Sequence, residues 1–157
     1  MSSPAPLLDV FTLETVLLEL PLGSKDEILE ALVTHAIRCK ALPKTRKEQV
    51  LASLIERESR GSTAFGKGVA VPHARIPGLQ RAVGIVARSG EGADFRAIDG
   101  EPVHAFLVLI SPESRSEEHL ATLRWISQAA RDPDFVSFIR QAQTAEAVLD
   151  VLQEHAP

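Results

Sequence analysis

Apolar residues recur at helical spacing in two neighbouring segments of the first third of the chain. The first segment follows Ser24 and Glu27, whose three-residue separation is typical of a capping box at a helix start. The second follows a similar pair, Thr45 and Glu48, and ends before Gly61, a common helix stop. The apolar positions are Ile28, Leu29, Leu32, Val33, Ala36 and Ile37 in the first, and Val50, Leu51, Leu54 and Ile55 in the second. The pattern predicts two consecutive helices.

The middle of the chain favours strands. Residues 103–110 are apolar except for His104, which is typical of a strand that is covered on both faces. Residues 82–87 and 69–71 are rich in β-branched side chains, and residues 16–20 indicate a further short strand near the N-terminus.

Helical spacing returns in the last third, in three segments. Their apolar positions are Leu120, Leu123, Ile126 and Ala130; Phe135, Phe138 and Ile139; and Val148, Leu149 and Leu152. The resulting order is a strand, two helices, several strands and then helices. This order predicts an α/β fold with a single-domain mixed sheet flanked by helices on both faces. We expect residues 1–6 to form a flexible tail and residues 7–157 to form the one domain.

The composition and net charge of the chain argue against several classes of protein. A content of 45% hydrophobic and 24% charged residues is that of a globular protein, and the net charge of −4 argues against nucleic-acid binding. The single Cys39 cannot form an internal disulfide, and with no recognisable signal segment this favours a cytoplasmic protein. The longest apolar run, residues 105–110, is far shorter than the ~20 residues that span a bilayer, so no direct membrane insertion is expected.

The glycine-rich stretch at residues 60–75 carries the densest candidate chemistry. Its spacing from Gly61 to Lys67 resembles a phosphate-binding P-loop, but Gly68 replaces the required Ser or Thr. The helix also precedes the strand, which is the reverse of the P-loop order. A metal site is disfavoured because no two histidines have i, i+4 spacing and there is no cysteine pair. The chain also lacks the G-x-S-x-G pattern of many serine hydrolases.

Covalent catalysis by His73 is a further possibility. This residue follows Pro72 at a polar strand exit, and an imidazole can accept and pass on a phosphoryl group. Arg57 at the end of the second helix and His119 in the first turn of a later helix could meet phosphoryl oxygens. They reach His73 only if its strand lies beside the strand ending at Ile110, which periodicity does not decide. An ordinary surface role for Arg57 and a helix-start role for His119 stay open.

The sequence around His73 resembles a known family. RESRGSTAFGKGVAVPHAR, residues 57–75, is similar to the phosphorylation segment of the fructose/mannitol-type enzyme IIA proteins of the bacterial phosphoenolpyruvate:sugar phosphotransferase system (PTS). The family pattern G-x-T-x-x-G-x-G-[IV]-A-[IV]-P-H-[GA] is filled at every position. FRAIDGEPVHAFLVLISP, residues 95–112, and EHLATL, residues 118–123, are similar to two further family blocks. The resemblance extends over roughly residues 13–152.

The resemblance implies a PTS enzyme IIA type-2 fold and roles for three residues. His73 is expected to be phosphorylated by the phosphohistidine of the carrier protein HPr. His119 is expected to support the phosphoryl group without carrying it, and Arg57 to contact it. No cofactor is implied beyond the covalent phosphohistidine, and no metal.

The loop before His73 is also expected to bind the phosphoryl group. Ser62 and Thr63 either donate hydroxyl hydrogen bonds to its oxygens or only shape the loop. Gly66 and Gly68 would let the loop backbone approach the phosphate closely. We expect an apolar rim for carrier docking, with Ala64, Phe65 and Ile76 as its side chains.

Three functions remain open on these grounds. The family divides into nitrogen-type regulators, which act on target proteins, and transport components, which pass phosphate to a sugar-specific IIB domain. The AIDGEPV block at residues 97–103 looks closer to the regulators, and we favour that reading. A non-catalytic binding module on the same fold is the alternative from another class.

Overall fold

The computed structural model describes residues 7–156, so the expected tail at residues 1–6 lies outside the described part of the chain. The described residues form five strands and six α-helices, with two short 3-10 turns. The elements in chain order are α1 (Leu7–Val10), β1 (Phe11–Leu17), α2 (Lys25–Arg38), η1 (Lys44–Arg46), α3 (Lys47–Ser59), β2 (Val69–Ala70), β3 (His73–Ile76), β4 (Val83–Ala93), β5 (Val103–Pro112), η2 (Glu113–Arg115), α4 (Ser116–Ala129), α5 (Pro133–Gln141) and α6 (Ala145–Glu154).

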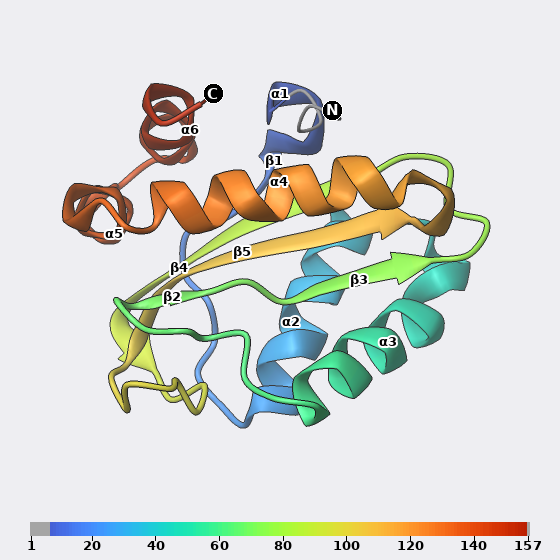
Figure 1. The fold of residues 1–157 in the computed structure, drawn as a ribbon, viewed down its shortest axis with the longest axis horizontal. Coiled ribbons are helices and arrows are strands. Elements are labelled where there is room, and N and C mark those ends of the chain that lie inside the picture. The colour runs from blue at the N-terminus through green and yellow to red at the C-terminus, as the bar shows by residue number, and fades with distance from the viewer. Residues whose placement is uncertain (1–6, 157) are drawn as a thin grey trace.

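The strands form one mixed sheet in the order β1-β4-β5-β2, with β3 also paired to β5. β1 runs parallel to β4, β4 runs antiparallel to β5, and both β2 and β3 run parallel to β5. β2 and β3 therefore follow one another along the same edge of β5, as Figure 1 shows. Pro72 separates them, because proline lacks the N–H that a continuous ladder would use.

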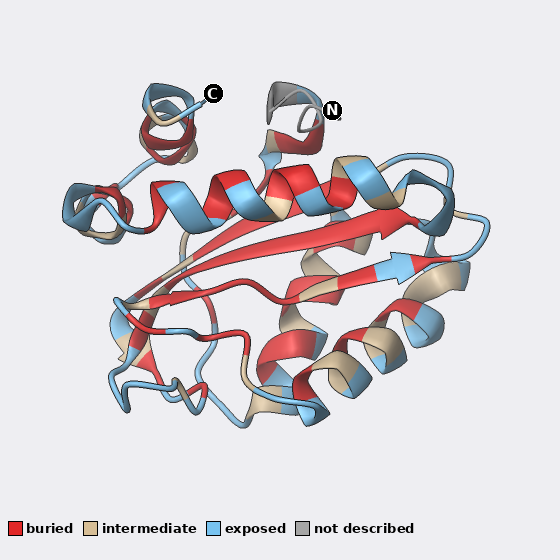
Figure 2. Ribbon diagram, viewed as in Figure 1, coloured by how far each residue is buried: buried red, intermediate tan, exposed pale blue. Residues whose placement is uncertain are grey.

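Helices cover both faces of the sheet, with α2 and α3 on one face and α4, α5 and α6 on the other (Figure 1). The side chains of β5 alternate between the two cores. Phe106, Val108 and Ile110 pack towards α2 and α3. Leu107 and Leu109 pack towards the C-terminal helices. Figure 2 shows β5 buried almost throughout, so the predicted α/β fold with a flanked mixed sheet is confirmed.

Local signals were accurate for some helix boundaries and wrong for others. The capping box at Ser24 is present, since its hydroxyl accepts from the Glu27 N–H and the Glu27 carboxylate accepts from the Ser24 N–H. The prediction of a capping box at Thr45 is wrong, because η1 occupies this position and α3 starts later, without a side-chain cap. The first strand begins at Phe11 and not at Val16; a register irregularity between these two residues disturbs the alternation that sequence reading depends on.

Candidate functional site

A cleft of about 690 Å³ opens between the last turns of α3, strand β3 and the start of α4. It brings together three residues that are far apart in the sequence. They are Arg57, His73 and His119, which are the three that sequence reasoning singled out for chemistry. Their convergence depends on the pairing of β3 with β5, in which His73 lies opposite Leu109. The condition that periodicity could not decide is therefore met.

His73 is the first residue of β3 and is half-buried. Its Nδ1 lies 2.8 Å from the carbonyl oxygen of Val71. A carbonyl can only accept, so Nδ1 carries the proton and the neutral ring keeps the lone pair on Nε2. Burial lowers the pKa of His73; the Val71 carbonyl opposes this shift, and the nearby Arg57 charge adds to it. His73 is therefore neutral near pH 7, with its nucleophilic nitrogen fixed by geometry.

His119 lies in the first turns of α4 and is only 5% exposed. Its Nδ1 lies 2.7 Å from the hydroxyl oxygen of Ser111 near the end of β5, which fixes the orientation of the ring. The centroids of the His119 and His73 rings are 5.6 Å apart. Burial lowers the pKa of His119 to about 4, and the neighbouring His73 and Arg75 contribute to this shift. The cleft thus holds two neutral imidazoles side by side at neutral pH.

Three arginines line the same cleft, which also includes Glu56 and Glu113. One guanidinium nitrogen of Arg57 donates to the carbonyl of Gly61 at 2.9 Å. Arg60 pairs with Glu56 on the surface of α3 at 3.3 Å. The three guanidinium groups make the cleft suitable for a phosphoryl group.

The third arginine, Arg75, was missed by sequence reasoning. It lies two residues after His73 on β3 and donates to the Ser116 hydroxyl at 2.6 Å. Alternate residues of a strand share a face, so the spacing of His73 and Arg75 was a signal that could have identified it.

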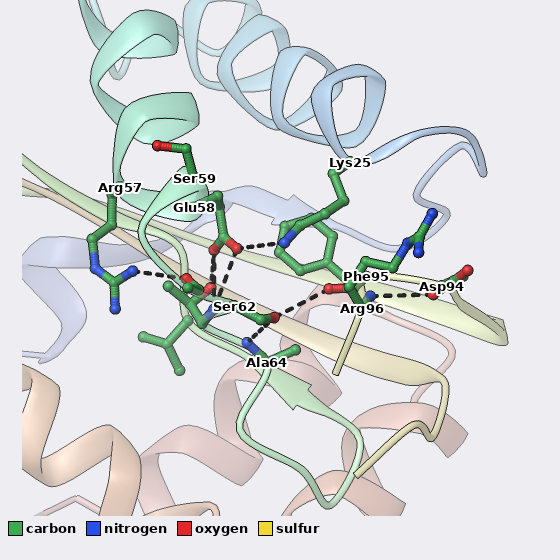
Figure 3. A network of polar contacts seen from close by, with 12 residues as sticks. Lys25, Arg57, Glu58, Ser59, Ser62, Ala64, Asp94, Phe95 and Arg96 are labelled. Atoms are coloured by element: carbon green, nitrogen blue, oxygen red, sulfur yellow. Dashed lines mark hydrogen bonds and ion pairs between the residues drawn. The ribbon is translucent and has the colours of Figure 1, made fainter. Parts of the chain in front are cut away.

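Ser62 and Thr63 do not line this cleft. Figure 3 shows that Ser62 donates to the carbonyl of Phe95, at 3.2 Å. The backbone N–H and hydroxyl of the buried Thr63 both donate to the carboxylate of Glu58. Glu58 in turn pairs with Lys25 at 2.9 Å. These hydroxyls hold the chain after α3 in place through bonds to Phe95 and Glu58.

Gly66 and Gly68 do not reach the cleft either. Gly68 hydrogen-bonds through its carbonyl to the start of β5, where the next residue pairs with Ala105, whereas His73 pairs with Leu109. Four residues of strand correspond to about 13 Å. The glycine loop therefore approaches β5 well before the cleft begins.

The rim of the cleft also differs from expectation. Ala64 and Ile76 are fully buried, so assigning them to a docking rim was wrong; Phe65 is 40% exposed but does not line the cleft. The apolar rim is formed instead by Leu120, which is 52% exposed, with Leu123 one turn further along α4. The sequence pattern had grouped both with Ile126 and Ala130 as the apolar positions of this helix.

Residues 7–156 contain neither a metal-binding cluster of side chains nor a membrane-spanning helix. No cluster of three or more His, Cys, Asp or Glu side chains there could hold a metal ion. Within the same residues, no helix combines the length and apolar character needed to cross a bilayer.

Comparison with known proteins assigns the chain to a family. Residues 9–155 match the family model described as phosphoenolpyruvate-dependent sugar phosphotransferase system, EIIA 2. A nitrogen regulatory protein of Pseudomonas aeruginosa is 38% identical over 136 residues, which cover 87% of each chain. The fructose-specific EIIA component of the PTS of Haloferax volcanii is 30% identical over 142 residues, which cover 90% of this chain and 91% of that one.

A solved structure gives the same result. The crystal structure of nitrogen regulatory protein IIA-Ntr from Neisseria meningitidis aligns with a TM-score of 0.79 at 31% identity, covering 92% of this chain and 97% of that one. The resemblance inferred from the motifs is thus confirmed. The chain belongs to the EIIA type-2 family of the phosphoenolpyruvate-dependent sugar phosphotransferase system and is similar to its nitrogen regulatory proteins.

Proposed function

We propose that the protein is a histidine phosphocarrier that accepts a phosphoryl group from phospho-HPr on Nε2 of His73 and acts as a nitrogen-type regulator. The observation that carries this proposal is the hydrogen bond between Nδ1 of His73 and the Val71 carbonyl, 2.8 Å long. It leaves Nε2 unprotonated, in a ring that lines a cleft with three arginines. A neutral, oriented imidazole next to phosphate-binding cations is what phosphoryl acceptance needs.

The step transfers one phosphoryl group between two imidazoles. The lone pair of His73 Nε2 forms a bond to phosphorus while the N–P bond of the donor phosphohistidine breaks and returns its electron pair to the leaving nitrogen. No proton has to leave His73 during attack, because Nδ1 keeps its hydrogen. The positive charge that develops on the ring is stabilised by the Val71 carbonyl.

The surrounding groups would hold the charge on the phosphoryl oxygens. Arg57 and Arg75 lie on opposite sides of His73 in sequence and both line the cleft. Each is anchored to a neighbouring oxygen through one nitrogen, which leaves other N–H groups for a ligand. His119, neutral and held by Ser111, would orient the phosphoryl group without competing for it. Positioning and electrostatics dominate catalysis in phosphoryl transfer.

The partner proteins would dock over the rim of the cleft. The exposed Leu120 and its neighbour Leu123 offer apolar contact beside the reacting nitrogen. HPr would dock first as the phosphoryl donor. A regulatory target protein, or a IIB domain in a transport component, would dock afterwards.

Phosphoryl acceptance is tested by incubating the protein with phosphoenolpyruvate, enzyme I and HPr and then recording the intact mass. We expect one acid-labile phosphoryl group on the peptide that contains His73, and none on the His73→Ala variant. The His35→Ala variant changes a histidine outside the cleft, which bonds to the Glu14 carbonyl, and should be phosphorylated normally. Unmodified wild-type protein beside an active control EIIA would overturn the proposal and favour a non-catalytic binding module.

Transport is the second candidate, because a fructose-specific EIIA component is 30% identical to the chain. The two roles differ in what happens after phosphorylation. A transport component passes its phosphoryl group rapidly to a sugar-specific IIB domain, whereas the regulator that we propose keeps it. Measuring the loss of label from the phosphorylated protein on addition of fructose- and mannitol-type IIB domains separates the two.

A further inference from the structure

A second cleft, of about 800 Å³, lies towards the start of β5 and away from His73. β4, the first residues of β5 and α5 form its walls together with the loops at residues 67–68 and 99–102. Lys67 and Gly68 come from the glycine-rich loop that the His73 cleft does not use. The densest motif in the sequence therefore contributes to two sites and not to one.

Three arginines line this second cleft, and two of them are anchored. Arg88 of β4 donates through Nε to the carbonyl of Arg140 at 2.6 Å and through a terminal nitrogen to the carbonyl of Leu18 at 3.2 Å. Arg140 of α5 donates through Nε to the carbonyl of Gly90 at 3.3 Å. An arginine has five N–H donors, so several remain unused on each guanidinium after these bonds. Anchoring reduces the entropy that these side chains lose when they bind an anion.

Although Asp99 and Glu101 also line the cleft, the three arginines lack a paired carboxylate within the described part of the chain. Arg88, Arg131 and Arg140 form no ion pair with any carboxylate in residues 7–156. Cations that share a cleft without partners repel one another, and a bound anion would relieve that repulsion. Because the net charge of the chain is −4, a surplus of positive charge would not explain their accumulation here.

The glycine loop adds a fourth cation, Lys67, in an unusual backbone conformation. Its φ of +60° lies in the left-handed region, which non-glycine residues rarely adopt. The Asp99 carboxylate fixes this turn by accepting from the Lys67 N–H at 3.0 Å and from the Glu101 N–H at 3.1 Å. These two bonds lower the pKa of Asp99, so it stays ionised as part of the scaffold. Lys67 thus occupies a backbone conformation that glycine would adopt at a lower energetic cost.

Gly68 keeps the adjoining wall open. Its φ is +78°, and a Cβ placed there would lie 3.2 Å from Val136 and 3.7 Å from the ring of His104. Val136 and Pro102 add an apolar part to the wall, while Asp99, Glu101, Ser137 and Gln141 also line the cleft. His104 is oriented by a 2.8 Å hydrogen bond between its Nδ1 and the Ser89 carbonyl. The cleft therefore combines three guanidinium groups and a lysine, which outnumber the two carboxylates, with an apolar face.

We propose that this second cleft binds a small organic anion that carries phosphate or carboxylate groups. Its volume is that of a small-molecule site, since such pockets usually measure about 300–1,000 Å³. Guanidinium forks match the geometry of phosphate and carboxylate oxygens, and the apolar wall would contact the carbon skeleton. Anion binding in this second cleft does not require His73 to be phosphorylated, so it can be tested independently of the phosphocarrier proposal.

The test is a titration of ¹⁵N-labelled protein followed by NMR, with inorganic phosphate, glucose 6-phosphate and succinate as separate probes. We expect saturable shifts of the Gly68 and Gly90 amides with at least one organic anion, and its identity tells phosphate from carboxylate recognition. The Arg131→Ala/Arg140→Ala variant should bind that probe about tenfold more weakly or worse, since charged hydrogen bonds are lost. The Arg81→Ala/Arg96→Ala variant makes the same charge change at two exposed loop positions and should bind normally.

Several outcomes would overturn the proposal. One is the absence of saturable shifts at Gly68 and Gly90 with all three probes up to about 20 mM, a range that includes weak millimolar binding. Another is a response confined to His73 and its neighbours, which would mean that only the first cleft takes anions. A third is unchanged affinity in a folded Arg131→Ala/Arg140→Ala variant.

Discussion

The carboxylate of Glu58 joins the end of α3 to the loop that leads to His73, and its removal is the most informative single change in the fold. The side chain is 5% exposed and pairs with Lys25, itself 23% exposed, at 2.9 Å. It also accepts from the backbone N–H and the hydroxyl of Thr63. A Glu58→Ala variant leaves a half-buried ammonium group and two buried donors without their acceptor.

The expected cost follows from these contacts. Removing one member of a buried ion pair costs about 3–5 kcal/mol, and each buried donor that loses its partner costs about 1–3 kcal/mol. Because water can reach Lys25, the total loss of stability is smaller than the sum of these separate costs. We expect Glu58→Ala to lower the free energy of unfolding by about 3–4 kcal/mol. For a domain of this size that corresponds to a fall of about 10 °C in Tm.

Urea unfolding followed by the fluorescence of Trp125, the only tryptophan, measures the loss directly. Glu56→Ala is the matched control, since Glu56 lies on the same helix in an exposed pair with Arg60 and should cost less than about 0.5 kcal/mol. A double-mutant cycle with Lys25→Ala isolates the ion pair, with an expected coupling of about 1 kcal/mol or more. A loss for Glu58→Ala below about 1 kcal/mol, or equal to that of Glu56→Ala, would mean that the Glu58 contacts do not stabilise the fold.

Three further predictions concern the cleft and its loop. The pKa of His119 is about 4 in the folded protein and 6.5 in the unfolded chain. Below pH 6.5 the unfolded chain therefore binds a proton that the folded protein does not, so stability is complete above pH 6.5 and falls as the pH is lowered towards 4. At about one pH unit below 6.5 the loss due to His119 should be about 1 kcal/mol, less than the full value of about 1.4 because the cleft is open to solvent. Urea unfolding repeated across pH should show a weaker pH dependence in His119→Gln, because only the other histidines with a lowered pKa, such as His73, then contribute. Arg75→Ala should slow phosphoryl transfer from HPr by about tenfold to a hundredfold in a quenched-flow assay, while Arg96→Ala, in an exposed loop, leaves the rate unchanged; equal rates would remove Arg75 from the site. Ser62→Ala should lose about 1 kcal/mol of stability, since its hydroxyl bonds to Phe95, yet keep the wild-type transfer rate; a large rate loss would restore Ser62 to the phosphate site.

Local sequence patterns predicted correctly those elements whose formation depends mainly on nearby residues. The capping box at Ser24 and the apolar run of β5 depend on neighbours within a few residues, and both were read correctly. The prediction of a capping box at Thr45 was wrong because a 3-10 turn forms there in place of the helix start. Which of the two forms depends on the direction in which the chain leaves Pro43. Gly66 and Gly68 were expected to approach the phosphoryl group but lie outside the His73 cleft, because nothing local shows which stretch of β5 each part of the loop meets.

The site shows the same division between local and distant information. His73 stood out because a long motif surrounds it. Its meeting with His119 required the pairing of β3 with β5, which is a non-local property of the sheet. Glu58 could not be recognised, since a glutamate on a helix is usually exposed to solvent and only the tertiary fold buries it against Thr63.

NMR of the phosphorylated protein shows directly whether Nε2 of His73 carries the phosphoryl group, as we propose. The protein, labelled with ¹⁵N-histidine, would be phosphorylated by phosphoenolpyruvate, enzyme I and HPr and observed through long-range ¹H–¹⁵N correlations of its imidazole rings. We expect only the His73 ring to change, with phosphorus bonded to Nε2, the nitrogen that does not bond to the Val71 carbonyl. A phosphoryl group on Nδ1, on the ring of His119, or on no histidine at all would contradict this proposal.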